Sequence, residues 1–169
     1  WDFTLYSEGF LAPRQYGYDD NRSPFISIEE LMRHETLDPR YLSIGEFCEL
    51  KSLSQQIGEQ FITPLELAKM VRDDCTEAMD IIKELRAPEN EPVLNSELDD
   101  LETWCYLGFY FADKLCAGVW LETFSHSKTE ADREKAVEYL EECLDHWNNI
   151  IGLTRDRYKP MPHVSMGFS

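Results

Sequence analysis

Residues 94–124 read LNSELDDLETWCYLGFYFADKLCAGVWLETF, and this stretch decides the fold that the sequence predicts. Small and apolar residues recur along it in alternating steps of four and three, which brings them onto one face of an α-helix. They are Leu94, Leu98, Leu101, Cys105, Gly108, Ala112, Leu115 and Val119. Between Trp104 and Leu121, large apolar residues fill the other faces as well. A helix that is apolar nearly all round must be covered on several sides by other elements.

Two further amphipathic segments can provide that cover. The first begins at Thr63, where Pro64 suits the first helical position and Glu66 completes a capping box. The second begins at Thr129, which we expect to cap the helix together with Asp132. Because the connections to the central helix are short, we expect each segment to run antiparallel to it.

Two short helices are predicted ahead of the long ones. Ser27 with Glu30 and Ser43 with Glu46 both have the spacing of a capping box. We expect the second of these helices to end near Gly58. The predicted fold is therefore all-α: an antiparallel bundle of three long helices with two short helices and irregular, aromatic-rich termini.

The chain is expected to divide into three parts. Residues 1–26 carry seven aromatic residues without a helical period, and we interpret them as an irregular arm that links to an upstream domain missing from this sequence. Residues 27–152 form the helical domain, and residues 153–169 form an irregular tail containing Pro160 and Pro162.

The charge of the chain restricts its partners. The formal net charge is -17, from 33 acidic and 16 basic residues, which argues against nucleic acid and against anionic membranes. No apolar run approaches the roughly 20 residues that a membrane-spanning helix needs. The acidic surface is interpreted as a solvated one, and the alternative is that it recruits cations or basic proteins.

The five cysteines contain no CxxC pair, so we expect buried thiols and no disulfide framework. Cys143 and His146 could supply half of a zinc site, but no second half has matching spacing. A di-iron bundle needs Glu-x-x-His motifs, and none is present. We therefore expect no metal and no cofactor, with a core thiol at Cys143 beside a surface imidazole at His146.

Charged residues interrupt the central helix at Asp113 and Lys114. Adjacent helical residues do not face each other, so each needs a partner of its own. We expect structural ion pairs with neighbouring helices, and the alternative is that these side chains face a ligand. Asp99, Asp100 and Glu102 are interpreted as complements to the positive end of the helix dipole.

Two other groups of residues are candidates for a ligand site or an interface. One is the aromatic set Trp104, Phe111 and Trp120, which the two predicted flanking helices leave uncovered. The other is a basic group in the tail, which could bind an acidic sugar or dock against an acidic surface of the same chain. Its members are Arg155, Arg157, Tyr158, Lys159 and His163.

About half of the chain resembles a known helical region. The matching segments are residues 101–124, residues 134–150 (EKAVEYLEECLDHWNNI) and residues 155–160 (RDRYKP). They resemble the C-terminal helical domain of large multidomain bacterial carbohydrate-active proteins, the alpha-glucuronidase-like glycoside hydrolases. The resemblance rests on Ala112-Asp113-Lys114, on the helix ending in His146-Trp147, and on Tyr158-Lys159-Pro160. It transfers no catalytic residue to this chain.

That resemblance implies a non-catalytic accessory domain that packs against and supports a neighbouring domain of a glycoside hydrolase-like protein. It also implies a periplasmic or secreted location. The alternative is a free-standing helical module for protein interaction, because residues 136–144 (AVEYLEECL) resemble a tetratricopeptide helix. The 34-residue period of such repeats is absent.

Overall fold

The computed structural model describes residues 26–86 and 91–157, and this part of the chain is all-α, as predicted. Its helices are α2 (Ile28–Met32), α3 (Ile44–Ser52), α4 (Pro64–Leu85), α5 (Pro92–Ser127) and α6 (Glu130–Thr154). The described residues form no strand, and their one β-type pairing is an isolated bridge between Tyr41 and Ile62. None of these helices is long and apolar enough to cross a membrane.

Capping boxes begin three of the helices where the sequence predicts them. In each box the hydroxyl of the first residue accepts a backbone N–H, and the glutamate three residues later accepts the N–H of the cap. The pairs are Ser27 with Glu30, Ser43 with Glu46, and Thr63 with Glu66. The three predicted helix starts are therefore confirmed. They could be predicted because a capping box involves only residues close together in the sequence.

Other helix boundaries differ from the prediction. Helix α3 ends at Ser52 and not near Gly58, because Ser54 adopts a left-handed φ of 54° that turns the chain away. Helix α5 starts at Pro92, two residues earlier than expected. Thr129 is the N-cap of α6, but its hydroxyl donates to the carboxylate of Asp132 and caps no backbone N–H.

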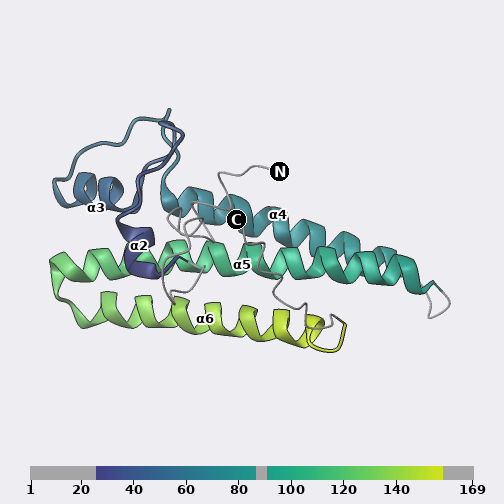
Figure 1. The fold of residues 1–169 in the computed structure, drawn as a ribbon. Coiled ribbons are helices and arrows are strands. Elements are labelled where there is room, and N and C mark those ends of the chain that lie inside the picture. Colours follow the sequence, from purple (N-terminus) through teal and green to yellow (C-terminus); the bar gives the residue numbers. More distant parts are fainter. Residues whose placement is uncertain (1–25, 87–90, 158–169) are drawn as a thin grey trace, which may run out of the picture.

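Helix α5 is the centre of the described structure and packs against all four of the other helices. Helices α4 and α6 lie along opposite sides of α5 and run antiparallel to it, while α2 and α3 lie across its C-terminal half (Figure 1). Helices α4 and α6 make their main contacts with α5 and not with each other. The three long helices therefore form an open layer, and the structure does not confirm a bundle in which all three pack together.

The middle of α5 is buried on every side, as its sequence predicts. Every residue from Phe111 to Val119 is buried. The buried side chains of α5 join those of α2, α3 and α4 in one core cluster, which includes Leu31, Ile44 and Ala68. Burial of this apolar surface stabilises the fold by roughly 25 cal/mol per Å².

A close approach at Gly118 lets the short helices reach α5. A Cβ atom at this position would lie 2.7 Å from Cδ1 of Ile44, well inside van der Waals contact. Ile44 is itself buried and has little room to move. Gly118 therefore sets how closely α3 packs on α5.

Replacing Gly118 by leucine should lower the free energy of unfolding by about 1–3 kcal/mol relative to Gly152→Leu, measured by urea unfolding. Gly152 is the matched control because it is helical and exposed, and a Cβ atom there would have no neighbouring atom within 4 Å. Both variants replace a helical glycine by leucine, so a greater loss of stability in Gly118→Leu reports the clash with Ile44. Equal stability of the two variants would contradict the close approach.

Candidate functional site

Asp113 forms an ion cluster in the middle of α5 that joins the three long helices. Its side chain is 1% exposed. One carboxylate oxygen pairs with the guanidinium of Arg72 on α4, and the other lies 2.9 Å from Nε2 of His146 on α6. The predicted ion pair between Asp113 and a neighbouring helix is confirmed.

His146 is not the surface imidazole that the sequence suggested. Its side chain is mostly buried, and its ring stacks on that of Phe109 with centroids 5.4 Å apart. Nε2 faces the carboxylate of Asp113, and because an ionised carboxylate only accepts hydrogen bonds, Nε2 carries the proton. Nδ1 is buried without a hydrogen-bond partner among the described residues. The available signal was spacing: His146 stands three residues after Cys143 and four before Ile150, both of which are buried.

The cluster keeps Asp113 ionised. Burial raises the pKa of this carboxyl group, but hydrogen bonds from His146 and Arg72 outweigh burial and hold the pKa below its usual value. The negative charge is compensated by the guanidinium, whose own side chain is partly exposed. This arrangement is typical of a structural ion pair.

Lys114 is also buried, but it does not form the expected ion pair with any residue in the described part of the chain. Its ammonium group donates to the backbone carbonyl of Ile26 and to the hydroxyl of Tyr110, 3.1 Å away. It also lies over the Tyr110 ring, 5.2 Å from the centroid. Burial lowers the pKa of Lys114. These contacts tie the segment before α2 to α5.

A second buried carboxylate, Asp99, lies nearer the start of α5 and is 3% exposed. It accepts a 2.8 Å hydrogen bond from Arg86 and pairs with Arg157, while Arg86 also pairs with Glu102. The helix-dipole interpretation is wrong for Asp99, because α5 begins at Pro92 and the first turn ends before this residue. Of the basic tail residues, Arg157 therefore pairs with a buried carboxylate of the same chain.

The remaining candidates do not come together as one site. Trp104 is 40% exposed, whereas Phe111 is 5% exposed and belongs to the core. Trp120 is partly buried, with the ammonium of Lys135 lying 4.0 Å from its ring centroid. The prediction of a single uncovered aromatic face is therefore wrong, because Phe111 is covered by the core cluster, while Trp104, seven residues earlier on the same side of α5, is exposed.

Of the tail candidates, the structure describes Arg155 and Arg157. Arg155 is exposed and follows the last residue of α6, so the helix continues two residues past the predicted boundary at residue 152. Tyr158, Lys159 and His163 lie outside the described residues, as does the predicted arm up to residue 25.

The cysteines act as small apolar residues, as expected. All five are free, and four are buried. Burial raises the pKa of Cys75 to about 11 and that of Cys143 to about 12, so neither thiol is an effective nucleophile. Within the described ranges, no group of three or more His, Cys, Asp or Glu side chains could hold a metal ion.

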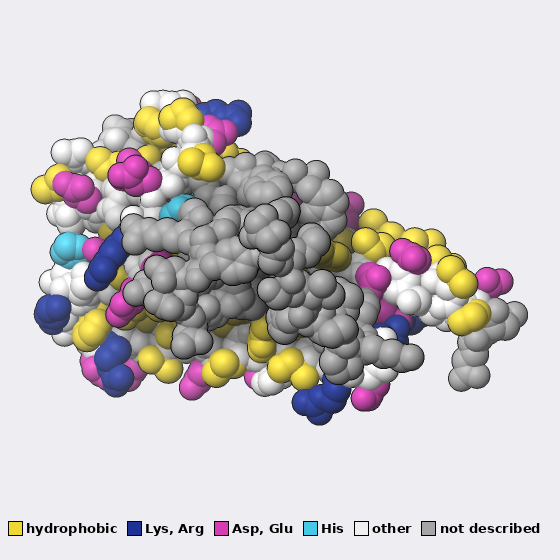
Figure 2. Space-filling model, viewed as in Figure 1, with side chains coloured by type: hydrophobic (Ala, Val, Ile, Leu, Met, Phe, Trp, Pro, Cys, Tyr) yellow, Lys and Arg dark blue, Asp and Glu magenta, His cyan; other side chains and the backbone are white. Residues whose placement is uncertain are grey.

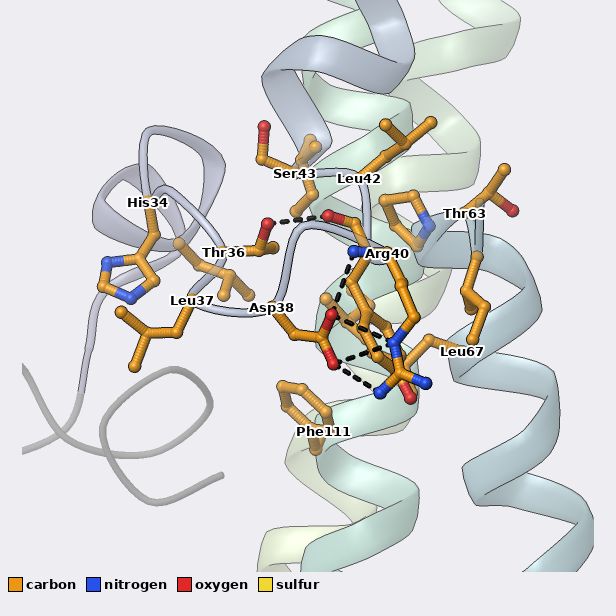
Figure 3. Close-up of a pocket in the computed structure, with 16 residues that line it drawn as sticks. His34, Thr36, Leu37, Asp38, Arg40, Leu42, Ser43, Thr63, Leu67 and Phe111 are labelled. Atoms are coloured by element: carbon orange, nitrogen blue, oxygen red, sulfur yellow. Dashed lines mark hydrogen bonds and ion pairs between the residues drawn. The ribbon is translucent and has the colours of Figure 1, made fainter. Parts of the chain in front are cut away.

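The described structure also contains a cavity of about 480 Å³, which the sequence did not reveal. Figure 3 shows it between the connection from α2 to α3, the start of α4 and the middle of α5. Its lining includes Phe111 from α5 and the ion pair of Asp38 with Arg40. The sequence pattern does not predict this cavity, because its walls come from segments that are distant along the chain.

No protein-family model, no curated protein and no solved structure matches this chain. Inference of function therefore rests on the sequence resemblance, the fold, the cavity and the apolar side chains that are exposed on the described helices.

Removing the carboxylate of Asp113 should destabilise the protein strongly. We expect Asp113→Ala to lower the free energy of unfolding by about 3–5 kcal/mol, because it leaves His146 and Arg72 without their buried partner. The matched control is Asp73→Ala, which breaks the exposed pair with Lys69 and should change stability by less than about 0.5 kcal/mol. Urea unfolding monitored by circular dichroism measures both, and similar losses would refute the structural role of the cluster.

The same cluster should make stability depend on pH. The pKa of Asp113 is lower in the folded protein than in the unfolded chain, so its contribution is complete above the unfolded pKa and is lost as the pH falls. We expect the stability difference between wild type and Asp113→Asn to shrink as the pH falls below about pH 4. Urea unfolding at a series of pH values tests this. A difference that stays constant down to about pH 3 would contradict it.

Proposed function

We propose that this chain is a non-catalytic helical accessory domain of a carbohydrate-active, glycoside hydrolase-like protein, where it packs against a neighbouring domain and supports it. The carbohydrate-active part of the proposal rests on the resemblance of residues 101–124, 134–150 and 155–160. The supporting role rests on an exposed apolar surface.

The observation that carries the supporting role is the apolar end of the α4–α5 pair. Five apolar side chains there are 42% to 75% exposed: Ile81, Leu85, Val93, Leu94 and Leu101. The C-terminal end of α4 and the N-terminal end of α5 reach beyond the C-terminal end of α6 (Figure 1). Figure 2 shows hydrophobic side chains along this narrow end of the molecule, with acidic side chains between them. Exposed apolar side chains gathered at one end are typical of a surface that packs against another protein surface.

The three buried charged side chains of the described residues support a non-catalytic role. Asp113 and Asp99 are paired with basic side chains, and Lys114 is hydrogen-bonded within the core. Catalytic acids and bases must reach a substrate, whereas these groups are enclosed between helices. Their arrangement suits stability better than chemistry.

The alternative, a free-standing helical module for protein interaction, gains support from the cavity. A cavity with an apolar floor is a usual place for a ligand or for a side chain of a partner. The two proposals differ in what covers the apolar end of α4 and α5, because an accessory domain needs a neighbour there.

Charged substitutions at the apolar end test the supporting role in the longer gene product. Leu85→Asp combined with Leu101→Asp should leave the 169-residue chain folded, because both side chains are exposed. In a protein that also contains the neighbouring domain, the same two substitutions should lower the melting temperature of that domain by several degrees, measured by differential scanning calorimetry.

The matched control is Leu144→Asp, an exposed leucine on α6. It should leave the neighbouring domain unchanged. If the double variant leaves the melting temperature of that domain at the wild-type value, the packing surface is not at the α4–α5 end and the supporting role fails.

A further inference from the structure

The cavity has an apolar floor of closely packed side chains. Leu31 from α2, Ile44 from α3, and Phe111 and Leu115 from α5 all line it, and all four are buried. Its volume of about 480 Å³ lies within the range of small-molecule sites, roughly 300–1,000 Å³. The space suits a ligand of one or two rings.

Three of the four hydroxyl-bearing side chains of the wall, those of Thr36, Ser43 and Thr63, are engaged in local hydrogen bonds, and the fourth belongs to Tyr41. Thr36 donates to the carbonyl of Tyr41 at 2.7 Å. Ser43 and Thr63 each donate to the glutamate of their own capping box at 2.8 Å, and each accepts the backbone N–H of that glutamate at 3.2 Å. None of these hydroxyls has a hydrogen left to donate to a ligand.

An ion pair stands at the edge of the cavity. Nε and Nη2 of Arg40 donate to the carboxylate of Asp38 at 2.6 to 3.1 Å, and the backbone N–H of Arg40 adds a 3.0 Å bond. These hydrogen bonds lower the pKa of Asp38 to about 2, so it stays charged. The pair is neutral overall and gives no preference for an anion.

Arg40 nevertheless keeps a donor available. Its Nη1 group makes no hydrogen bond to any described residue, and its side chain is 72% exposed. The imidazole of His34, another polar group of the lining, lies at the opposite edge from Arg40 (Figure 3). A ligand would therefore meet the guanidinium donor at one edge and apolar side chains along its length.

We infer that this cavity binds an uncharged, apolar ligand of one or two rings whose single hydrogen-bond acceptor faces Arg40. A sugar is the wrong class of ligand, because each of the several hydroxyls that it buries needs a partner, and three of the four wall hydroxyls are engaged. This inference goes beyond the proposed accessory role and does not depend on it. The two can fail separately, since one concerns the α4–α5 end and the other concerns the middle of α5.

Titration of the 169-residue chain with prodan, an uncharged naphthalene ketone, tests the inference directly. We expect saturable binding with a blue-shifted fluorescence emission, because the rings leave water for the apolar floor. Leu67→Trp should weaken this binding at least tenfold by filling the cavity, which Leu67 lines from α4. The matched control Leu144→Trp, on the exposed face of α6, should bind as the wild type does.

Arg40→Leu provides a second variant in case Leu67→Trp does not fold. The Arg40 side chain is largely exposed, so its loss should preserve the fold, and loss of one hydrogen bond should weaken prodan binding about two- to tenfold. Xylose and glucuronic acid should not displace the probe. Non-saturable binding, equal affinity in Arg40→Leu, or displacement of prodan by either sugar would overturn the inference.

Discussion

The described structure depends on one carboxylate buried in the middle of its longest helix. Asp113 lies in the most enclosed part of α5, where an uncompensated charge would be very unfavourable. Its two oxygens are satisfied by Arg72 on α4 and His146 on α6. Since α4 and α6 pack mainly on α5 and not on each other, this cluster links both flanking helices at one level along the central helix.

The same principle operates nearer the start of α5. Asp99 is buried there and pairs with Arg86, just after α4, and with Arg157, just after α6. The two carboxylates therefore hold the flanking helices at two separate levels. Apolar contacts supply most of the stabilisation, but they tolerate sliding, whereas a buried ion pair has a strict geometric requirement.

Which side chains are buried and which are accessible to a partner guides the interpretation of function. The buried charges and thiols of the described helices are engaged in packing, and burial disfavours the reactive form of the thiols. Two features stay available to a partner: the exposed apolar end of α4 and α5, and the cavity beside α2 and α3. The apolar end lies at the start of α5, whereas the cavity lies beside the middle of α5, so one can contact a neighbouring domain while the other holds a ligand.

The sequence by itself determined the all-α class, the three capping boxes and the burial of the middle of α5, because these depend on residues within one or two helical turns of each other. Only the tertiary structure decided the partners of Asp113, since Arg72 and His146 stand 41 and 33 residues away. It also buried His146, covered Phe111 while leaving Trp104 exposed, and formed the cavity. The physical reason is that helix rotation and packing level result from contacts between helices, which the spacing within one helix does not specify.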